Sequence, residues 1–169
     1  MHFHNITKDD MLNGDGLRTV LWVAGCPHRC PGCHNPITWE ADGGVEFDAE
    51  AERELFEALA KPYISGITFS GGDPLHPENR GEIARLIKKA RELFPFKSIW
   101  LYTGFLWEEI CDLDFISMVD VVVDGRFVEE LKDPKLFWKG SSNQRVIDVH
   151  KTLAEGHIVL HCKERESTV

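Results

Sequence analysis

The sequence predicts a single α/β domain built as a partial, open β/α barrel around a mainly parallel sheet. Strand patterns and helix patterns alternate along the chain, which is typical of right-handed βαβ units. The 169 residues correspond to one domain and are too few for the eight-fold barrel, which needs about 250 residues. Because no repeat, low-complexity segment or linker interrupts the chain, we expect residues 1–169 to fold as one unit.

The first half of the chain is predicted to contain two strands and a helix. Arg18–Val23 is a short run rich in β-branched and aromatic residues, which is typical of a strand. Ala49–Ala60 is rich in Ala, Glu and Leu, and Asp48 precedes it as a plausible N-cap. Residues 66–69 form the next predicted strand, and the turn-forming residues 70–74 end it.

The second half of the chain begins with the clearest helical pattern, over residues 83–94. Apolar residues recur there at helical spacing, with Arg and Lys between them. The other expected elements are strands at Ser98–Tyr102, 119–123, 145–149 and 157–160, and a short helix at Trp107–Ile110. The uninterrupted apolar character of 119–123 favours a sheet with helices on both faces.

Composition excludes several classes of function. The formal net charge is −9, with 19 Lys and Arg against 28 Asp and Glu, which argues against a protein that binds nucleic acid or anionic membranes. No apolar run approaches the roughly 18 residues that a membrane-spanning helix needs. The residues after Met1 lack the charged and apolar stretches of a signal peptide. We therefore expect a soluble, cytoplasmic protein.

The five cysteines are unevenly spaced. Cys26, Cys30 and Cys33 lie within eight residues, whereas Cys111 and Cys162 are isolated. An odd number with three crowded together is a poor disulfide framework and favours metal binding or catalysis. We expect Cys111 and Cys162 to be small buried residues, because free cysteine is among the most buried residue types.

Residues 25–36 surround the three crowded cysteines and contain three prolines and two glycines, which disfavour a regular helix. Three thiolates can hold three irons of a [4Fe–4S] cube and leave the fourth iron open to a substrate or cofactor. A structural zinc site with His28 or His34 as the fourth ligand is the alternative. It fits less well, because no second ligand pair follows at zinc-finger spacing.

Unusual residues follow each of the first four predicted strands. These loops are the cysteine loop, residues 70–74, residues 102–104 and residues 124–126. Ligands of α/β proteins gather at the carboxyl ends of parallel strands. We therefore predict that the four loops converge on one mouth.

The spacing Cys-x-x-x-Cys-x-x-Cys after a first strand resembles the signature of radical S-adenosylmethionine (SAM) enzymes. Seven stretches, in order, closely resemble glycyl-radical-activating enzymes, specifically those that serve anaerobic ribonucleoside-triphosphate reductases. The stretches are Asn-Gly-Asp-Gly-Leu-Arg-Thr (13–19), Cys-Pro-Gly-Cys-His-Asn (30–35) with Thr38 and Trp39, Ser-Gly-Gly-Asp-Pro-Leu-His-Pro (70–77), Trp-Leu-Tyr-Thr-Gly (100–104), Val-Asp-Gly-Arg-Phe (123–127), Leu-Lys-Asp (131–133) and Gly-Ser-Ser-Asn-Gln (140–144). On this basis residues 1–12 are an N-terminal segment, 13–150 the family core, and 151–169 a C-terminal appendix whose polar tail, 163–169, we expect to be mobile.

The resemblance implies a partial barrel of the radical SAM type and an oxidoreductase activity. Cys26, Cys30 and Cys33 would ligate a [4Fe–4S] cluster and form the catalytic centre. SAM would bind the open iron and be cleaved to methionine and a 5′-deoxyadenosyl radical, which would take a hydrogen from a glycine Cα of the reductase. The implied partners are the anaerobic reductase as protein substrate and a reduced flavodoxin-type electron donor.

The SAM-contacting residues implied by the resemblance lie in three loops. They are Gly32, Cys33, His34, Gly71, Gly72, Asp73, Asp124 and Arg126. Residues 71–73 would lie against the methionine ammonium group, and residues 32–34 would present backbone groups and an imidazole face to the adenine. Gly32 stands where many superfamily members carry an aromatic residue, and Asp15 stands where related activases often have proline. For Asp124 and Arg126 the alternative is a surface turn with a local ion pair.

The long stretch from 124 to 144 is locally basic and aromatic in an acidic protein. Its basic residues are Arg126, Lys132, Lys135 and Lys139, and its aromatic residues Phe127, Phe137 and Trp138 are expected to be exposed. Irregular segments of this length are often functional, and we expect this one to contact the reductase. The alternative is a flap that packs over the barrel opening.

Three further aromatic residues and one histidine are expected to be structural. Trp22, Trp100 and Trp107 are assigned to the core, and His76 to a structural position, while Tyr102 either lines the mouth or completes a core strand.

Two other functions remain open beside the activase. One is a radical SAM enzyme that acts on a small molecule. The other is a non-catalytic iron–sulfur or zinc protein, which would have no need of the second loop at 70–74.

Overall fold

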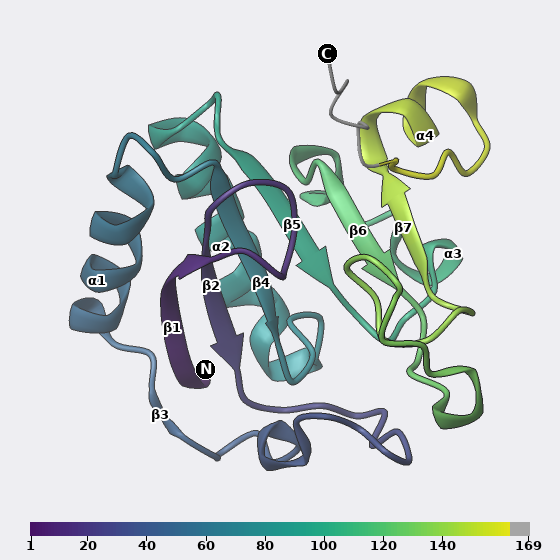
Figure 1. The fold of residues 1–169 in the computed structure, drawn as a ribbon. Helices are drawn as coiled ribbons and strands as arrows, with labels where there is room; N and C mark the ends of the chain where they lie inside the picture. The colour runs from purple at the N-terminus through teal and green to yellow at the C-terminus, as the bar shows by residue number, and fades with distance from the viewer. Residues whose placement is uncertain (163–169) are drawn as a thin grey trace.

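The computed structural model describes residues 1–162, which form one α/β domain with a mixed seven-stranded sheet (Figure 1). The strands are β1 His2–Asp10, β2 Arg18–Val23, β3 Val45–Glu46, β4 Gly66–Gly71, β5 Ser98–Tyr102, β6 Val121–Asp124 and β7 Arg145–Asp148. The α-helices are α1 Ala49–Ala60, α2 Pro77–Leu93, α3 Trp107–Ile110 and α4 Val149–Glu155, and short 3-10 turns lie at η1 Pro36–Thr38, η2 Ile116–Met118 and η3 Glu129–Leu131. The predicted α/β class is confirmed.

The sheet has the order β3-β1-β2-β4-β5-β6-β7 and does not close. The four central strands, β2, β4, β5 and β6, are parallel, and β1, β3 and β7 are antiparallel additions at the two sides. Their register aligns Val20 with Thr68, Thr68 with Trp100, and Trp100 with Val121. The carboxyl ends of the four parallel strands therefore lie along one edge of the sheet, as the predicted βαβ units require.

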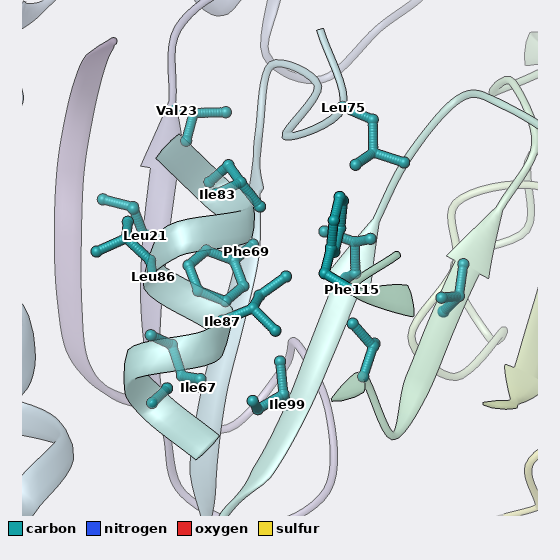
Figure 2. Close-up of a cluster of buried hydrophobic side chains, with 14 of the residues drawn as sticks. Leu21, Val23, Ile67, Phe69, Leu75, Ile83, Leu86, Ile87, Ile99 and Phe115 are labelled. Carbon is teal, nitrogen blue, oxygen red and sulfur yellow. The ribbon is translucent and has the colours of Figure 1, made fainter. Parts of the chain in front are cut away.

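The main core lies between the helices and one face of the sheet. Figure 2 shows Ile83, Leu86 and Ile87 of α2 packed toward Leu21, Ile67 and Phe69 of the central strands. Apart from Ala58, the buried apolar residues of the four α-helices all belong to this one cluster. The expectation of helices on both faces is therefore wrong.

The other face of the sheet is covered by loops. Its buried cluster consists of Trp100, Val121, Val123 and Val146, with Tyr102 and Trp138 packed against it. Trp138 comes from the 124–144 stretch, and its ring lies 5.1 Å from that of Trp100, edge to face. β6 is apolar on both sides because one side meets the helices and the other meets these aromatic rings. Trp138, expected to be exposed, is thus partly buried.

The two long helices begin where local chemistry caps them. The Asp48 side chain accepts hydrogen bonds from the N–H groups of Glu50 and Ala51 at the start of α1. α2 begins at Pro77, with His76 as its N-cap. The α1 bounds were predicted correctly, whereas α2 starts before Ile83 because its polar first turns carry no apolar periodicity. His76 has the structural role expected of it.

The strands β1 and β3 were missed, and the strand predicted at 157–160 does not form. The alternation of β1 is broken by a register shift between Phe3 and Asn5, which hides its period of two. β1 makes the N-terminal segment part of the sheet. Residues 157–160 contribute only an isolated bridge between Ile147 and Leu160.

Several single-residue expectations can also be compared with the structure. Trp100 and Trp107 are buried as expected, whereas Trp22 is partly exposed and donates from Nε1 to Thr7 Oγ1 at 2.8 Å. Cys111 is only partly buried and Cys162 is exposed, so the expectation of two buried thiols is wrong. The polar tail 163–169 lies outside the described residues. Among residues 1–162, no helix has the length and apolar character to cross a membrane.

Candidate functional site

The cysteine loop leaves the end of β2 and returns to its own base. Gly25 N–H donates to Thr38 O at 2.8 Å, and Cys26 N–H donates to Trp39 O at 3.0 Å. From the first turn of α2, the buried Asn79 donates through Nδ2 to Ala24 O at 2.7 Å. These bonds hold the loop closed where it leaves the sheet.

The three cysteines of this loop are free thiols, each partly buried. Asn35 N–H lies 3.4 Å from Cys33 Sγ, and the backbone N–H groups of His28 and Arg29 bond the Cys26 sulfur. Burial raises the pKa of the Cys26 thiol above its ordinary value, while the two N–H groups act to lower it. Sulfur ligands that accept backbone N–H bonds are characteristic of iron–sulfur sites, so the donor set fits such a cluster.

Within residues 1–162, no three His, Cys, Asp or Glu side chains form a group that could hold a metal ion. In a [4Fe–4S] cube each cysteine binds a different iron, and its sulfurs are spread further apart than the ligands of one ion.

The loop after β4 lies directly against the base of the cysteine loop. Gly72 N–H donates to Val23 O at 2.8 Å and Asp73 N–H donates to Gly25 O at 2.7 Å. A Cβ on Gly71, whose φ is +104°, would lie 2.6 Å from Val23 N. A Cβ on Gly72 would lie 2.4 Å from Gly25 O. Both glycines permit a close backbone approach, and the groups that they approach in this structure are the protein's own.

The Asp73 carboxylate joins three of the four predicted loops. It is 1% exposed and accepts four hydrogen bonds, from His28 Nε2 (2.8 Å), Thr103 Oγ1 (2.9 Å), Gly104 N (2.9 Å) and Leu75 N (2.8 Å). His28 comes from the cysteine loop, and Thr103 and Gly104 follow β5. The predicted convergence of these loops is confirmed, and Asp73 is its centre.

The fourth loop is held by Asp124, at the end of β6. Its carboxylate is fully buried and accepts from Trp107 N at 2.7 Å and from Arg145 Nε at 3.0 Å. The hydrogen bonds that Arg145 donates to Asp124 and Glu108 raise the pKa of Arg145 above its ordinary value. The ion pair of this loop is thus with Arg145 and not with Arg126, which is exposed. A contact of Asp124 or Arg126 with SAM stays a prediction.

A cavity of about 340 Å³ lies beside the cysteine loop. Its lining includes Asn13, His34, Tyr102, Lys132, Trp138 and Gln144. His34 is exposed, with its ring 5.3 Å from that of Phe127. The Tyr102 hydroxyl is buried without a hydrogen-bond partner in the described part of the chain, and burial raises the pKa of Tyr102 above its ordinary range. The cavity has a size typical of small-molecule sites and an unused polar group.

The comparisons with known proteins agree with this geometry. The profile of the 4Fe-4S single cluster domain family matches residues 12–147. A protein of Enterobacteria phage T4 is 45% identical over 146 residues, covering 86% of this chain and 93% of its own. Proteins of Escherichia coli K12 and Vibrio cholerae are 42% and 38% identical, covering 86% and 85% of this chain and 97% and 96% of their own. All three are named anaerobic ribonucleoside-triphosphate reductase-activating protein.

The chain belongs to the family of anaerobic ribonucleoside-triphosphate reductase-activating proteins. The resemblance stated from the sequence motifs is confirmed. Within this activating-protein chain, the matched 4Fe-4S domain spans the cysteine loop, the loop after β4 and the 124–144 stretch. α4 and the residues after it lie beyond the matched range.

Sequence reasoning missed two residues of this activating-protein site, His28 and Asn79, and it placed residues 102–104 at the mouth without their bonds to Asp73. His28 was considered only as a zinc ligand, and Asn79, Thr103 and Gly104 were not assigned to Asp73 or to the cysteine loop. A usable signal existed for His28 alone, because it stands between two cysteines in a loop that must dock on its neighbours. For Asn79, Thr103 and Gly104 no such signal existed, because their contacts depend on how the strands of the sheet align.

Proposed function

We propose that this protein is a radical SAM oxidoreductase of the cytoplasm that activates an anaerobic ribonucleoside-triphosphate reductase by generating a glycyl radical on it. The observation that carries the proposal is the loop of three free, partly buried thiols at the carboxyl ends of the parallel strands. The names and near-complete coverage of the relatives support the same reading. The open sheet with four central parallel strands supports a partial barrel of the radical SAM type.

In this proposal Cys26, Cys30 and Cys33 bind three irons of a [4Fe–4S] cluster, and the fourth iron is left for SAM. When bound and reduced by a flavodoxin-type donor, the cluster supplies the electron that cleaves SAM to methionine and a 5′-deoxyadenosyl radical, which then takes hydrogen from a glycine Cα of the reductase. Backbone N–H groups of neighbouring residues lie beside the Cys26 and Cys33 sulfurs. Other contacts of the protein orient the cysteine loop against β4 and β5.

SAM would lie at the mouth formed by the converging loops. The residues proposed to contact it are Gly32, Cys33, His34, Gly71, Gly72, Asp73, Asp124 and Arg126. The cavity between His34 and Tyr102 supports this position, because its buried hydroxyl has no partner among the described residues. Tyr102 would exclude water from one wall and offer that hydroxyl to the ligand.

The 124–144 stretch is proposed to contact the reductase with its exposed part. Arg126 and Phe137 are exposed, Phe137 by 62%, whereas Trp138 packs on Trp100. The covering flap and the partner surface are therefore two sides of one segment. Phe137→Ala is expected to weaken reductase activation while leaving SAM cleavage without the reductase unchanged. Equal loss of both activities would assign the whole segment to the flap.

The proposed function is tested by anaerobic reconstitution with iron and sulfide, followed by reduction and addition of SAM. The measurements are 5′-deoxyadenosine released and the glycyl-radical electron paramagnetic resonance (EPR) signal, with and without the matching reductase. Ala variants of Cys26, Cys30 and Cys33 are each expected to lose both, whereas Cys111→Ala keeps both. SAM cleavage that ignores the reductase would indicate a small-molecule enzyme. Retained zinc with no cluster and no cleavage would reject the proposal.

A further inference from the structure

His28 lies between the first two cysteine ligands in the sequence, and its side chain contacts the loop after β4. His28 Nε2 lies 2.8 Å from Asp73 Oδ2, and the two side chains are 4% and 1% exposed. We propose that His28 and Asp73 are a positioning pair that holds residues 26–30 in the conformation in which the cysteines receive the cluster. This inference rests on the cluster of the proposed function and assigns a role that neither residue had from the sequence.

The His28 ring is confined on two sides. Its edge meets the Phe105 ring at 4.6 Å and 74°. A Cβ added to Gly104 would lie 2.3 Å from His28 Cδ2. Gly104 also donates its N–H to Asp73 Oδ2 at 2.9 Å, so the same residue orients the acceptor and makes room for the donor.

Asp73 is a rigid acceptor for this histidine. Thr103 Oγ1 and Leu75 N hold one carboxylate oxygen at 2.9 and 2.8 Å, while Gly104 N holds the other. Of the hydrogen bonds that this carboxylate accepts, the one from His28 connects it to the cysteine loop. A buried and fully bonded carboxylate defines one position for its partner.

The backbone next to His28 needs such an anchor. Arg29 has φ +45°, a left-handed conformation that non-glycine residues rarely adopt without support from their surroundings. Its own side chain bonds Glu40 and lies 5.9 Å from the centre of the Trp39 ring, and the Arg29 and Glu40 side chains are 54% and 64% exposed. The bond from His28 to Asp73 holds the residue that immediately precedes this left-handed position.

The test measures cluster binding directly rather than activity. Wild type, His28→Ala and His28→Gln are reconstituted anaerobically, and three quantities are compared: iron per chain, the rate of cluster loss to an iron chelator, and the midpoint potential from EPR-monitored titration. Thermal unfolding of each metal-free protein reports on the fold. Arg29→Gln is the matched control, because it changes an exposed side chain in the same segment, residues 26–30.

We expect His28→Ala to lose its cluster about 10- to 100-fold faster than wild type, the range typical of residues that orient metal ligands. His28→Gln should recover most of this loss, because its amide N–H can donate to Asp73. Arg29→Gln should match wild type. A wild-type rate in His28→Ala would overturn the inference. So would a loss that His28→Gln does not rescue and that follows the unfolding temperature, since that indicates a merely structural role.

A second pair of variants tests the geometry. Gly104→Ala is expected to accelerate cluster loss alone, because the new Cβ displaces the His28 ring, and to have little further effect in the His28→Ala background. Additive effects of the two changes would contradict the pairing. If wild-type protein bound no cluster, the proposed function would fail and this inference with it, whereas a stable wild-type cluster with unaffected variants would reject the inference alone.

Discussion

Gly71 shows at the scale of one residue how closely the two loops of the site approach. Its φ of +104° and the 2.6 Å that would separate a Cβ from Val23 N leave no room for a side chain between β2 and β4. Backbone cannot move aside as a flexible side chain does. The position therefore demands glycine for two separate reasons, conformation and space.

Gly71→Ala is accordingly expected to lower the free energy of unfolding by about 2 kcal/mol or more, measured by urea unfolding of the metal-free protein. Gly81→Ala is the matched control. Gly81 lies within α2, and a Cβ there meets nothing within 4 Å, so helix propensity predicts stabilisation by roughly 0.5–1 kcal/mol. Equal effects of the two substitutions would show that the close approach has no energetic consequence.

The chemistry of single residues was the most predictable part of the site. The grouping of Cys26, Cys30 and Cys33 indicated a cluster without any structural knowledge, because thiolate preference for iron is a property of the side chain. The partners of Asp73 on the other loops were not predictable, because they lie 30, 31 and 45 residues away from it.

At the scale of elements, α1 and α2 are joined by an ion-pair network on their exposed sides. Glu52 of α1 bonds both Arg85 and Lys89 of α2. The hydrogen bond from Arg85 is the main cause that lowers the pKa of Glu52 from 4.5 to about 2. A carboxyl group whose pKa is depressed in the folded state stabilises that state when the pH is above the ordinary pKa. For Glu52 this contribution disappears as the pH falls from about 4.5 toward 2.

Glu52→Gln is expected to remove this part of the acid sensitivity and about 1 kcal/mol of stability at pH 7. The figure is small because Arg85 and Lys89 are 47% and 41% exposed and solvent screens them. Unfolding free energies measured from pH 7 to pH 2 test it. Glu50→Gln, at a side chain that is 79% exposed, serves as the control, and an identical pH profile for both variants would refute the prediction.

Helices were predicted better than edge strands. Asp48 and the spacing of apolar residues define α1 within its own sequence, whereas β1 depends on pairing with β2 through an irregular register. The predicted strand at 157–160 failed for the same reason, because only Leu160 pairs with Ile147. Whether a short segment forms a strand depends mostly on pairing and packing with its neighbour, and little on its own sequence.

At the scale of the whole molecule, the open side of the sheet is spanned by contacts between distant parts of the chain. His161 lies 2.6 Å from Asp15 through Nε2 and Oδ2, and its ring meets those of Trp100 and Trp138 at 5.2 and 5.5 Å. His161 N–H also donates to Val146 O at 2.8 Å. The C-terminal appendix thus connects β7 to the loop between β1 and β2 across the loop-covered face.

His161→Ala is expected to lower the free energy of unfolding by about 1 kcal/mol and to increase acrylamide quenching of tryptophan fluorescence, because Trp100 and Trp138 lose their cover. His157→Ala is the control, since His157 is 67% exposed and its ion pair is with Glu155. Its expected effect is below about 0.5 kcal/mol. Unchanged quenching in His161→Ala would show that the appendix does not cover this face.

The sequence alone determined the α/β class, the order of the main helices and central strands, and the family, and it singled out Cys26, Cys30 and Cys33 as the proposed cluster ligands. These follow from periodicity, capping and side-chain chemistry, which act between near neighbours. Only the tertiary structure decided that the helices cover one face, that Trp138 fills the other, and that His28 meets Asp73. Those contacts join loops far apart in the chain, and their positions depend on the register of four parallel strands, which no local pattern encodes.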